Sequence, residues 1–403
     1  MEGCACGFIG GAREKIKKVR SMTEDVKKRI LIFSTAYLPF VGGAEVAVKE
    51  ITGRIPEMEF VMITSKLDQK LPGVEKVGNK GVHRMGKGNY WDKYRLIWQG
   101  PRYASNLGHF DAIWGIMASY AGFAALRYRK RKKTPFLLTL QEGDSRWQIY
   151  KHVWWCWPYF KQIFKRADKI QAISNYLADW ARSLGAKCEV EVVANGVDIG
   201  KFRDIGDKRY EIGDKIKEDF DIKENDSIVI TVSRLVKKNG VGDLIKAMKF
   251  LDSEAHLLIA GDGELKDKLV LLVDRLGLVG RVHFLGRLNH EELLPYLQVS
   301  DVFCRPSLSE GLGNVFLEAM ATGIPIVGTN VGGIPDFLVD GETGLFCKAG
   351  DPGDIAEKIK KILEDIDLRN KLVMNGRKLV EEKFSWDLIA DKMKNIFDSL
   401  CAS

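Results

Sequence analysis

The sequence predicts an α/β protein in which two doubly wound, Rossmann-like domains face each other across a cleft. Three observations support this prediction. The length of 403 residues suits two or three domains, since one domain takes roughly 100–200 residues. Short apolar runs alternate with helical stretches in both halves, which indicates parallel sheets covered by helices. A charged stretch with few apolar residues, residues 203–227, interrupts the alternation, and its beginning marks the expected domain boundary.

The first half opens with a polar and basic segment, residues 1–29, which we expect to be an N-terminal extension. A solvated end and a membrane-surface helix both suit its composition. From Arg29 the run RILIFSTAYLPF predicts a short strand and a loop, and GGAEVAVKEITGRI predicts a helix. Further strands are predicted for FVMITS, DAIWGI, FLLTLQ, KIQAIS and VEVVANG. Together these elements predict an N-terminal domain over residues 30–203.

The alternation starts again after the charged stretch. Strands are predicted for SIVITVSRL, AHLLIAGDG, RVHFLG, DVFCRPS, IPIVGTN and GLFCKAG. Helices are predicted for VGDLIKAMKFL, ELKDKLVLLVDRLG, HEELLPYLQVS and NVFLEAMATG. We therefore expect a second domain over residues 204–385. The last segment, 386–403, contains an amphipathic helix that could close this domain or cross back to the first.

Composition places the chain among ordinary globular proteins, with 45% hydrophobic and 29% charged residues. No apolar run approaches the ~20 residues of a membrane-spanning helix, and the N-terminus lacks the apolar core of a signal peptide. The seven cysteines are scattered, without a CxxC pair. We expect a reduced, cytoplasmic protein, with the cytoplasmic face of a membrane as its alternative location.

The charges are divided unevenly along the chain. Residues 1–200 carry 33 Lys and Arg against 19 Asp and Glu, whereas residues 201–403 carry 29 against 35. This split suggests that the halves face different partners. An anionic membrane surface or an acidic acceptor suits the basic half. Because no nucleic-acid-binding motif is present, we do not expect a nucleic-acid partner.

The stretch SEGLGNVFLEAMATGIPIV contains the most informative loop in the chain. Its helix should begin near Asn314 and end at Gly323, since glycine past a helix end is a common stop signal. Gly311 and Gly313 permit close approach of a ligand to the backbone. The free N–H groups and positive dipole at the helix start favour an anion such as phosphate.

Two glutamates lie on either side of this phosphate loop. Glu310 precedes the helix, and Glu318 lies on its second turn. Carboxylates repel phosphate, but they accept hydrogen bonds from neutral hydroxyl groups. The pattern therefore predicts a ligand with a diphosphate between two hydroxyl-rich rings, which describes a nucleotide sugar.

The motif from Glu310 to Ala321 resembles the signature of the retaining glycosyltransferases of family 4, which have the GT-B fold. The rest of the chain from about residue 30 to 395 resembles that family in the same order. The matching segments are Tyr37-Leu-Pro-Phe-Val-Gly-Gly43-Ala-Glu, Asn195-Gly-Val-Asp198 with Phe202, Ser233-Arg234-Leu-Val, Gly261-Asp-Gly263, Phe284-Leu-Gly286 and Gly332-Gly333-Ile-Pro335.

The resemblance implies a role for each matching residue. Glu310 would hold the donor sugar, and Glu318 would hold the ribose. Arg234 would neutralise the diphosphate as the nucleotide departs. The other donor-binding positions would be Gly42 and Gly43 of the first domain, the turn Arg287-Leu288 against the base, and the backbone of Gly311, Leu312, Gly313 and Asn314.

Two positions depart from the family pattern. The family usually has a lysine five residues after the arginine, but this chain has Asn239, with Lys238 one residue earlier. We therefore count Lys238 with Arg234 and Glu310 among the catalytic candidates. Many members have a histidine where Gln141 stands, and glutamine does not titrate. On the acceptor side, the candidates are Gln141, Glu142 and Asp144, for which a solvated loop is the competing interpretation.

The resemblance implies stereochemical retention, in which the leaving phosphate helps to deprotonate the acceptor hydroxyl. The expected donor is a UDP- or GDP-linked hexose. No cofactor is expected and no metal ion, because Arg234 and the helix dipole supply positive charge and no Asp-x-Asp pair is evident.

Two clusters in the first half suggest the acceptor. Tyr128-Arg-Lys-Arg-Lys-Lys133 follows an apolar helical stretch, and Trp154-Trp-Cys-Trp-Pro-Tyr-Phe160 is rich in aromatic residues. The basic cluster suits an anionic membrane or the C-terminal end of a helix dipole. The aromatic cluster suits a membrane interface, a core or a sugar-binding surface. We expect a glycan or lipid-linked acceptor, with peripheral contact to an anionic membrane.

Two other functions are compatible with the sequence. An epimerase or hydrolase on the same fold would act on the donor without an acceptor. A non-catalytic nucleotide-sugar-binding protein is suggested by Asn239 and Gln141, where the family usually has titratable residues.

Overall fold

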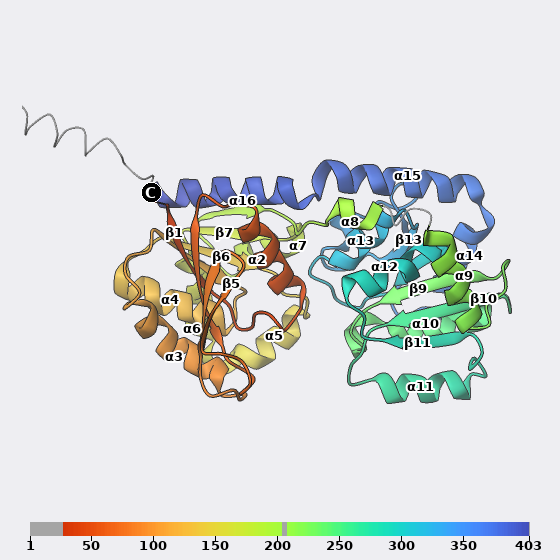
Figure 1. Ribbon diagram of the computed structural model, residues 1–403, viewed down its shortest axis with the longest axis horizontal. Helices are drawn as coiled ribbons and strands as arrows, with labels where there is room; N and C mark the ends of the chain where they lie inside the picture. The colour runs from red at the N-terminus through yellow and green to blue at the C-terminus, as the bar shows by residue number, and fades with distance from the viewer. Residues whose placement is uncertain (1–26, 204–207, 403) are drawn as a thin grey trace, which may run out of the picture.

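The structure, a computed structural model, describes residues 27–203 and 208–402. Two sheet-and-helix units lie side by side along the long axis, and a pair of helices runs across both (Figure 1). The predicted N-terminal extension lies outside the described residues except for its last three. The predicted boundary between residues 203 and 204 falls at the edge of the internal gap.

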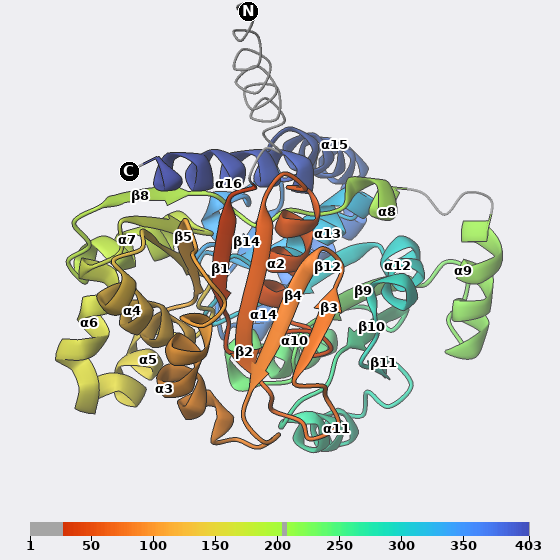
Figure 2. The same ribbon diagram turned by 60° about the vertical axis from the view of Figure 1, so that its left-hand side comes forward.

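Within the described residues, the first unit contains an eight-stranded sheet in the order β3-β4-β2-β1-β5-β6-β7-β8. All neighbours are parallel except β3 and β4. The strands are β1 (Arg29–Phe33), β2 (Glu59–Ser65), β3 (Val74–Val77), β4 (Lys80–Met85), β5 (Ala112–Ile116), β6 (Phe136–Leu140), β7 (Lys169–Ala172) and β8 (Glu189–Val192). Figure 2 shows the face of this sheet.

The central strands are apolar because both faces of the sheet are covered. In β1, Leu31 and Phe33 pack in one apolar cluster, whereas Ile30 and Ile32 pack in another. All four side chains are fully buried, which explains the continuous apolar run. The helices around this sheet are α2 (Gly43–Gly53), α3 (Asp92–Ala104), α4 (Tyr120–Lys132), α5 (Arg146–Val153), η1 (Trp154–Cys156), α6 (Trp157–Lys165) and α7 (Asn175–Ser183). The connecting helix α8 (Ile199–Arg203) packs against α13 (Asn314–Thr322) of the second unit.

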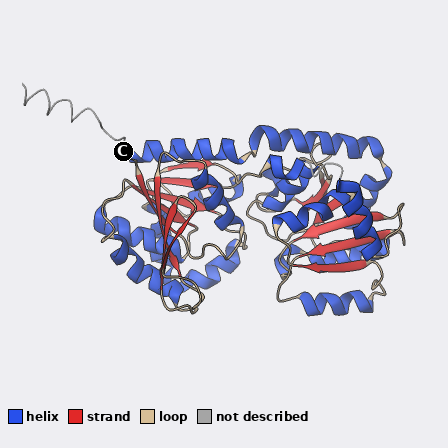
Figure 3. Cartoon of the chain, viewed as in Figure 1, coloured by secondary structure: helices blue, strands red, loops and turns tan. Residues whose placement is uncertain are grey.

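The second unit contains, among the described residues, a six-stranded parallel sheet in the order β11-β10-β9-β12-β13-β14. Its strands are β9 (Ser227–Val232), β10 (Ala255–Ala260), β11 (Val282–Gly286), β12 (Val302–Arg305), β13 (Ile326–Thr329) and β14 (Leu345–Cys347). Its helices are α9 (Lys208–Asp219), η2 (Lys237–Asn239), α10 (Val241–Ala247), η3 (Met248–Phe250), α11 (Lys266–Arg275), α12 (His290–Val299), α13 (Asn314–Thr322), η4 (Ile334–Asp336), α14 (Pro352–Glu364) and α15 (Ile366–Lys383). Helices cover both faces of each sheet (Figure 3), so the predicted fold class is confirmed.

The last helix, α16 (Trp386–Cys401), packs against the first sheet rather than the second. The ring of Phe397 lies 5.1 Å from that of Trp114 and 6.0 Å from that of Phe60, measured between centroids. An ion pair of 2.7 Å joins Lys28 to Asp398 beside it. This helix therefore ties the end of the chain to the first unit, as Figure 2 shows. Searching the described residues, we find no helix with the length and hydropathy needed to cross a bilayer.

Candidate functional site

In both sheets, the loops that carry the predicted site residues follow strands at the point where the strand order reverses. In the second sheet the reversal lies between β9 and β12, and in the first between β1 and β5. Ligands of doubly wound sheets bind at such points, beyond the carboxyl ends of the strands. The segments that follow these ends are Ser233-Arg234 after β9, the loop to α13 after β12, and Met117–Ser119 after β5.

The glycine-rich loop leads into α13 with the bounds that the sequence predicted. The helix runs from Asn314 to Thr322, with Gly313 at φ 94° before it and Gly323 at φ 82° after it. The turn at Gly332-Gly333 packs directly beneath this loop. A Cβ atom on Gly333 would lie 2.1 Å from the carbonyl oxygen of Gly311, so the close packing requires glycine.

The Glu310 carboxylate is held by two donors. Arg305 Nη2 donates to Oε2 at 2.6 Å, and the backbone N–H of Gly311 donates to Oε1 at 3.1 Å. The Glu310 and Arg305 side chains are each only 12% exposed. Charge-assisted hydrogen bonds of this length are among the stronger ones in proteins, so Glu310 is oriented before any ligand arrives.

Arg305 also contacts Asn239, the position that departs from the family pattern. The Asn239 side chain is buried, accepts from Arg305 Nη2 at 3.1 Å, and donates to the carbonyl oxygen of Arg234 at 2.6 Å. A guanidinium therefore lies beside the position where the family usually has a lysine. Sequence reasoning missed Arg305, although a charged residue at the end of the buried strand in DVFCRPS was a usable signal.

The two predicted cations of this region have different environments. Arg234 is exposed, and its guanidinium forms no ion pair with a carboxylate in the described part of the chain. The alternative role of Arg234 as one partner of a surface salt bridge is therefore not supported among the described residues. Lys238 reaches across to the first unit instead, with Nζ 2.8 Å from Oδ1 of Asp144.

The second predicted glutamate lies beside the turn that was predicted to contact a base. Glu318 Oε1 is 3.6 Å from His290 Nε2 at the start of α12. Burial raises the pKa of Glu318 above its ordinary value. Arg287 is exposed and Leu288 is half-buried, and both lie just before Asn289, the N-cap of α12.

The first unit approaches this loop at two places. At one, a Cβ atom on Gly43 would lie 3.4 Å from Asn314 Nδ2, and Gly42 is the N-cap of α2. The buried Asn195 side chain lies between the units there. Its Nδ2 donates at 3.2 Å to both Gln141 Oε1 and Asn314 Oδ1.

The second approach brings the Gln141–Asp144 loop against Glu310. A Cβ atom on Gly143 would lie 3.1 Å from Lys238 Nζ and 3.6 Å from Glu310 Oε1. A Cβ atom on Gly311 would lie 2.6 Å from the carbonyl oxygen of Glu142. The structure thus places the predicted acceptor-side loop directly opposite the predicted sugar-binding glutamate.

Glu142 has a buried carboxyl group, one oxygen of which has no hydrogen-bond partner among the described residues. Its Oε1 accepts from the backbone N–H of Ala118 at 2.6 Å. Its Oε2 has no hydrogen-bond partner within residues 27–203 and 208–402. Burial raises the pKa of Glu142 to about 7. The expected alternative of a solvated loop is therefore wrong for Glu142, whereas it describes the exposed side chain of Asp144.

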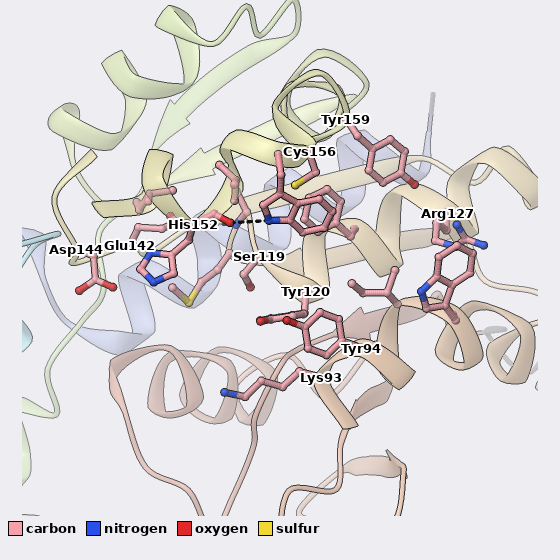
Figure 4. Close-up of a pocket in the computed structure, with 18 of the residues that line it drawn as sticks. Lys93, Tyr94, Ser119, Tyr120, Arg127, Glu142, Asp144, His152, Cys156 and Tyr159 are labelled. Carbon is pink, nitrogen blue, oxygen red and sulfur yellow. Dashed lines mark hydrogen bonds between the residues drawn. The ribbon is translucent and has the colours of Figure 1, made fainter. Parts of the chain in front are cut away.

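A cavity of about 1180 Å³ opens beside this carboxyl in the first unit. Figure 4 shows Glu142 and Asp144 at one end and Arg127 and Tyr159 at the other. The basic and aromatic clusters that the sequence showed far apart meet in its wall. The lining includes Lys93, Tyr94, Trp98, Ser119, Tyr120, Phe123, Arg127, Lys130, Arg131, Glu142, Asp144, Trp155 and Tyr159.

No group of three or more His, Cys, Asp or Glu side chains in the described ranges is placed to hold a metal ion.

Two family models match the chain. "Glycosyltransferase Family 4" matches residues 41–201, and "Glycosyl transferases group 1" matches residues 213–379. An uncharacterized glycosyltransferase of Methanocaldococcus jannaschii is 26% identical over 92% of this chain and 98% of its own. The lipopolysaccharide core biosynthesis glycosyltransferase LpsE of Rhizobium meliloti is 33% identical over 58% of this chain and 65% of its own. The structure of Anabaena HepE in complex with UDP-glucose superposes with a TM-score of 0.78 at 19% identity, over 92% of this chain and 99% of HepE.

Proposed function

This chain belongs to the group 1 glycosyltransferases of family 4 and is a nucleotide-sugar-dependent enzyme, and from this premise we propose which group it transfers and how. It moves a hexose from a UDP- or GDP-sugar to a hydroxyl group of a lipid-linked or membrane-proximal glycan, with retention. Residues 30–203 bind the acceptor and residues 204–385 bind the donor. The segment 386–403 fastens the second domain to the first.

The donor site is proposed at the α13 loop. Arg234 is exposed and without a carboxylate partner among the described residues, so it is available to a diphosphate. The N-terminal end of α13 adds the positive end of a helix dipole. Glu310 and Glu318 accept from hydroxyls of the sugar and of the ribose. The complex of HepE with UDP-glucose supports a donor of this class.

One observation carries the proposal: the loop bearing Glu142 and Asp144 touches the loop bearing Glu310. Gly143 and Gly311 permit this approach because neither adds a side chain between the domains. A sugar held by Glu310 would place its reacting carbon next to Glu142 and the inner end of the cavity. An acceptor in the cavity would then present its hydroxyl to the same carbon, which satisfies the need for proximity.

The reaction proposed is a substitution on one face of the sugar. The bond between the anomeric carbon and the phosphate oxygen breaks, and the acceptor oxygen forms the new bond on the same face. The acceptor proton passes to the departing phosphate. Arg234 and Arg305 stabilise the charge that accumulates on the diphosphate, as fixed donors do in other transferases. We propose that these groups perform this task without a divalent ion.

Glu142 is proposed to orient the acceptor. Its Oε2, which has no partner among the described residues, accepts a hydrogen bond from a second hydroxyl of the acceptor sugar, while the backbone N–H of Ala118 holds the other oxygen. Asp144 holds Lys238 at the edge of the site until the donor arrives. Gln141 has no acid–base role in this proposal. Its Oε1 accepts a hydrogen bond from Asn195 and so fixes the position of the loop.

Two measurements test the proposal. A thermal-shift panel of nucleoside diphosphates and nucleotide sugars identifies the donor, because a ligand at about 100 times its Kd adds about 2.7 kcal/mol of stability. Transfer to a lipid-linked glycan is then measured with that donor, with and without EDTA. We expect unchanged product formation with the chelator. Loss of product on chelation contradicts the metal-free mechanism, and equal donor consumption without acceptor indicates a hydrolase.

A further inference from the structure

The large cavity of the first domain has an outer end that the transfer reaction does not use. Resting on the proposed function, we infer that this end is an anion subsite, and that the acceptor is an amphiphile whose phosphate links a sugar to an apolar chain. Its sugar hydroxyl faces Glu142, its phosphate lies against α4, and its chain follows the aromatic wall.

The charge of the cavity wall is the first support. Lys93 of α3 and three residues of α4, namely Arg127, Lys130 and Arg131, line the cavity. None of the four forms an ion pair with a carboxylate among the residues that the structure describes. Figure 4 shows Arg127 at the end of the cavity away from the lining carboxylates Glu142 and Asp144, with Lys93 between them. Lining cations that are not ion-paired create a positive potential that attracts an anion.

Aromatic rings position two of these cations, Arg127 and Lys130, without neutralising them. The Arg127 guanidinium lies 3.7 Å from the ring centroid of Trp98, and Lys130 Nζ lies 5.2 Å from that of Tyr159. Cation–π contacts position a charge while leaving its hydrogen bonds free. The buried Arg127 Nε has no hydrogen-bond partner in the described part of the chain.

The apolar wall is the second support. Phe123 and Tyr159 stack at 5.3 Å, and Ile97, Ile149 and Val153 line the same space. The volume of about 1180 Å³ exceeds the ~300–1,000 Å³ that is usual for small-ligand pockets. The space therefore suits a sugar together with part of a chain.

The rim of the cavity extends this apolar surface to the outside. Trp98 is 55% exposed, Trp155 69% and Tyr90 61%, and all three line the cavity. Amphipathic rings of this kind favour the boundary between water and hydrocarbon. An acceptor chain that leaves the cavity would pass over them. A free sugar phosphate would leave this surface unused, so we commit to the amphiphile.

Binding measurements test the anion subsite and the site of the apolar chain separately. Isothermal titration of the full-length protein uses dodecyl phosphate, dodecyl maltoside as a neutral probe with the same chain, and glucose 1-phosphate as a phosphate without a chain. All are kept below their critical micelle concentrations. We expect dodecyl phosphate to bind at least about tenfold more tightly than either. Equal binding of dodecyl maltoside would refute the anion subsite, and equal binding of glucose 1-phosphate would refute the chain.

A matched pair of variants locates the subsite. Lys130→Gln with Arg131→Gln removes two lining charges and should weaken dodecyl phosphate binding about tenfold or more, since it removes two of the cations that attract the phosphate. Dodecyl maltoside binding should be unchanged. Lys132→Gln with Lys133→Gln removes two charges from the same helix end outside the lining, and should change binding less than twofold. Equal losses in both pairs would show non-specific attraction and overturn the site.

The stability shift with the nucleoside diphosphate is recorded for every protein in this experiment. A wild type that binds no nucleoside diphosphate defeats the proposed function, whereas the amphiphile titration still decides the subsite. Normal nucleotide binding with no preference for dodecyl phosphate defeats the subsite alone.

Discussion

Arg305 and Glu310 form a largely buried ion pair at the mouth of the donor loop, with Nη2 and Oε2 separated by 2.6 Å. The same Nη2 lies 3.1 Å from Oδ1 of Asn239. One guanidinium thus orients the glutamate opposite the Gln141–Asp144 loop and supplies positive charge beside the asparagine. Asn239, where the family usually has a lysine, is therefore in direct contact with the Arg305 guanidinium.

Removing Arg305 should impair turnover. Because the substitution could also lower stability, activity is measured well below the Tm of the variant. We expect Arg305→Met to lower kcat/KM by about 10²–10³-fold, the range for loss of one fixed transition-state donor. Adding Asn239→Lys to that variant should recover part of the loss, because it returns a cation to the same place. Steady-state kinetics with a fixed donor measure both effects.

The control for this prediction is Arg369→Met, which breaks the 2.9 Å ion pair with Asp301 away from the cleft. Its kcat/KM should stay within about twofold of the wild type, as expected for a partly exposed pair. If the double variant at 305 and 239 is no better than Arg305→Met, the coupling between the two positions is wrong.

Replacing each glutamate of the α13 motif by glutamine should impair a different property of the enzyme. Glu310→Gln should lower kcat by about 10²-fold or more while nucleoside diphosphate binding is retained, because its carboxylate is proposed to hold the sugar. Glu318→Gln should weaken nucleoside diphosphate binding itself, because its carboxylate is proposed to hold the ribose. Calorimetric titration with the diphosphate and initial-rate kinetics separate the two. Identical behaviour of the variants would contradict the assignment.

Glu142 should make stability depend on pH. Its pKa is raised to about 7 by burial, against ~4.3 in an unfolded chain. The folded state therefore holds this proton more tightly, so the stabilisation is fully present below pH ~4.3 and is lost as the pH rises to about 7. Glu142→Gln keeps an oxygen for the Ala118 N–H and does not titrate.

Relative to the wild type, Glu142→Gln should therefore gain stability between pH 5 and pH 8, by an amount on the order of 2–3 kcal/mol. Thermal midpoints of both proteins across this range measure the gain. The wild-type rate should rise through pH 7 as the carboxylate forms, and this inflection should be missing from the variant. Parallel stability curves would show that Glu142 does not titrate in this range.

Gly311 should be required for contact between the domains. A Cβ atom there would lie 2.6 Å from the carbonyl oxygen of Glu142. We expect Gly311→Ala to hold the cleft open and to lower transfer by at least about 10²-fold, since a displacement of ~1 Å can cost that much. Small-angle scattering should show a larger radius of gyration.

The matched control is Gly242→Ala in α10, where the new Cβ would make only ordinary contacts, 3.6 Å from Leu269. Its activity should equal that of the wild type, and alanine in a helix should not destabilise it. Full activity of Gly311→Ala would show that the two loops do not need to meet.

Local signals were sufficient to predict much of the fold. The α13 helix begins and ends as expected because Gly313 and Gly323 take left-handed conformations that few other residues adopt. The central strands were predicted because strands buried on both faces are apolar throughout. The edge strand β3, Val74–Val77, was not predicted, since its exposed and half-buried residues produce no apolar run.

The sequence alone determined the two α/β domains, the glycine-rich loop and the pair of glutamates around it, because each depends on residues close together in the chain. Only the tertiary structure decided that Arg305 stands beside Asn239, that Glu142 is buried, and that the basic end of α4 meets the aromatic residues of η1 and α6 around one cavity. These relationships join residues tens of positions apart, and the pKa and charge of a group depend on the neighbours that folding brings to it.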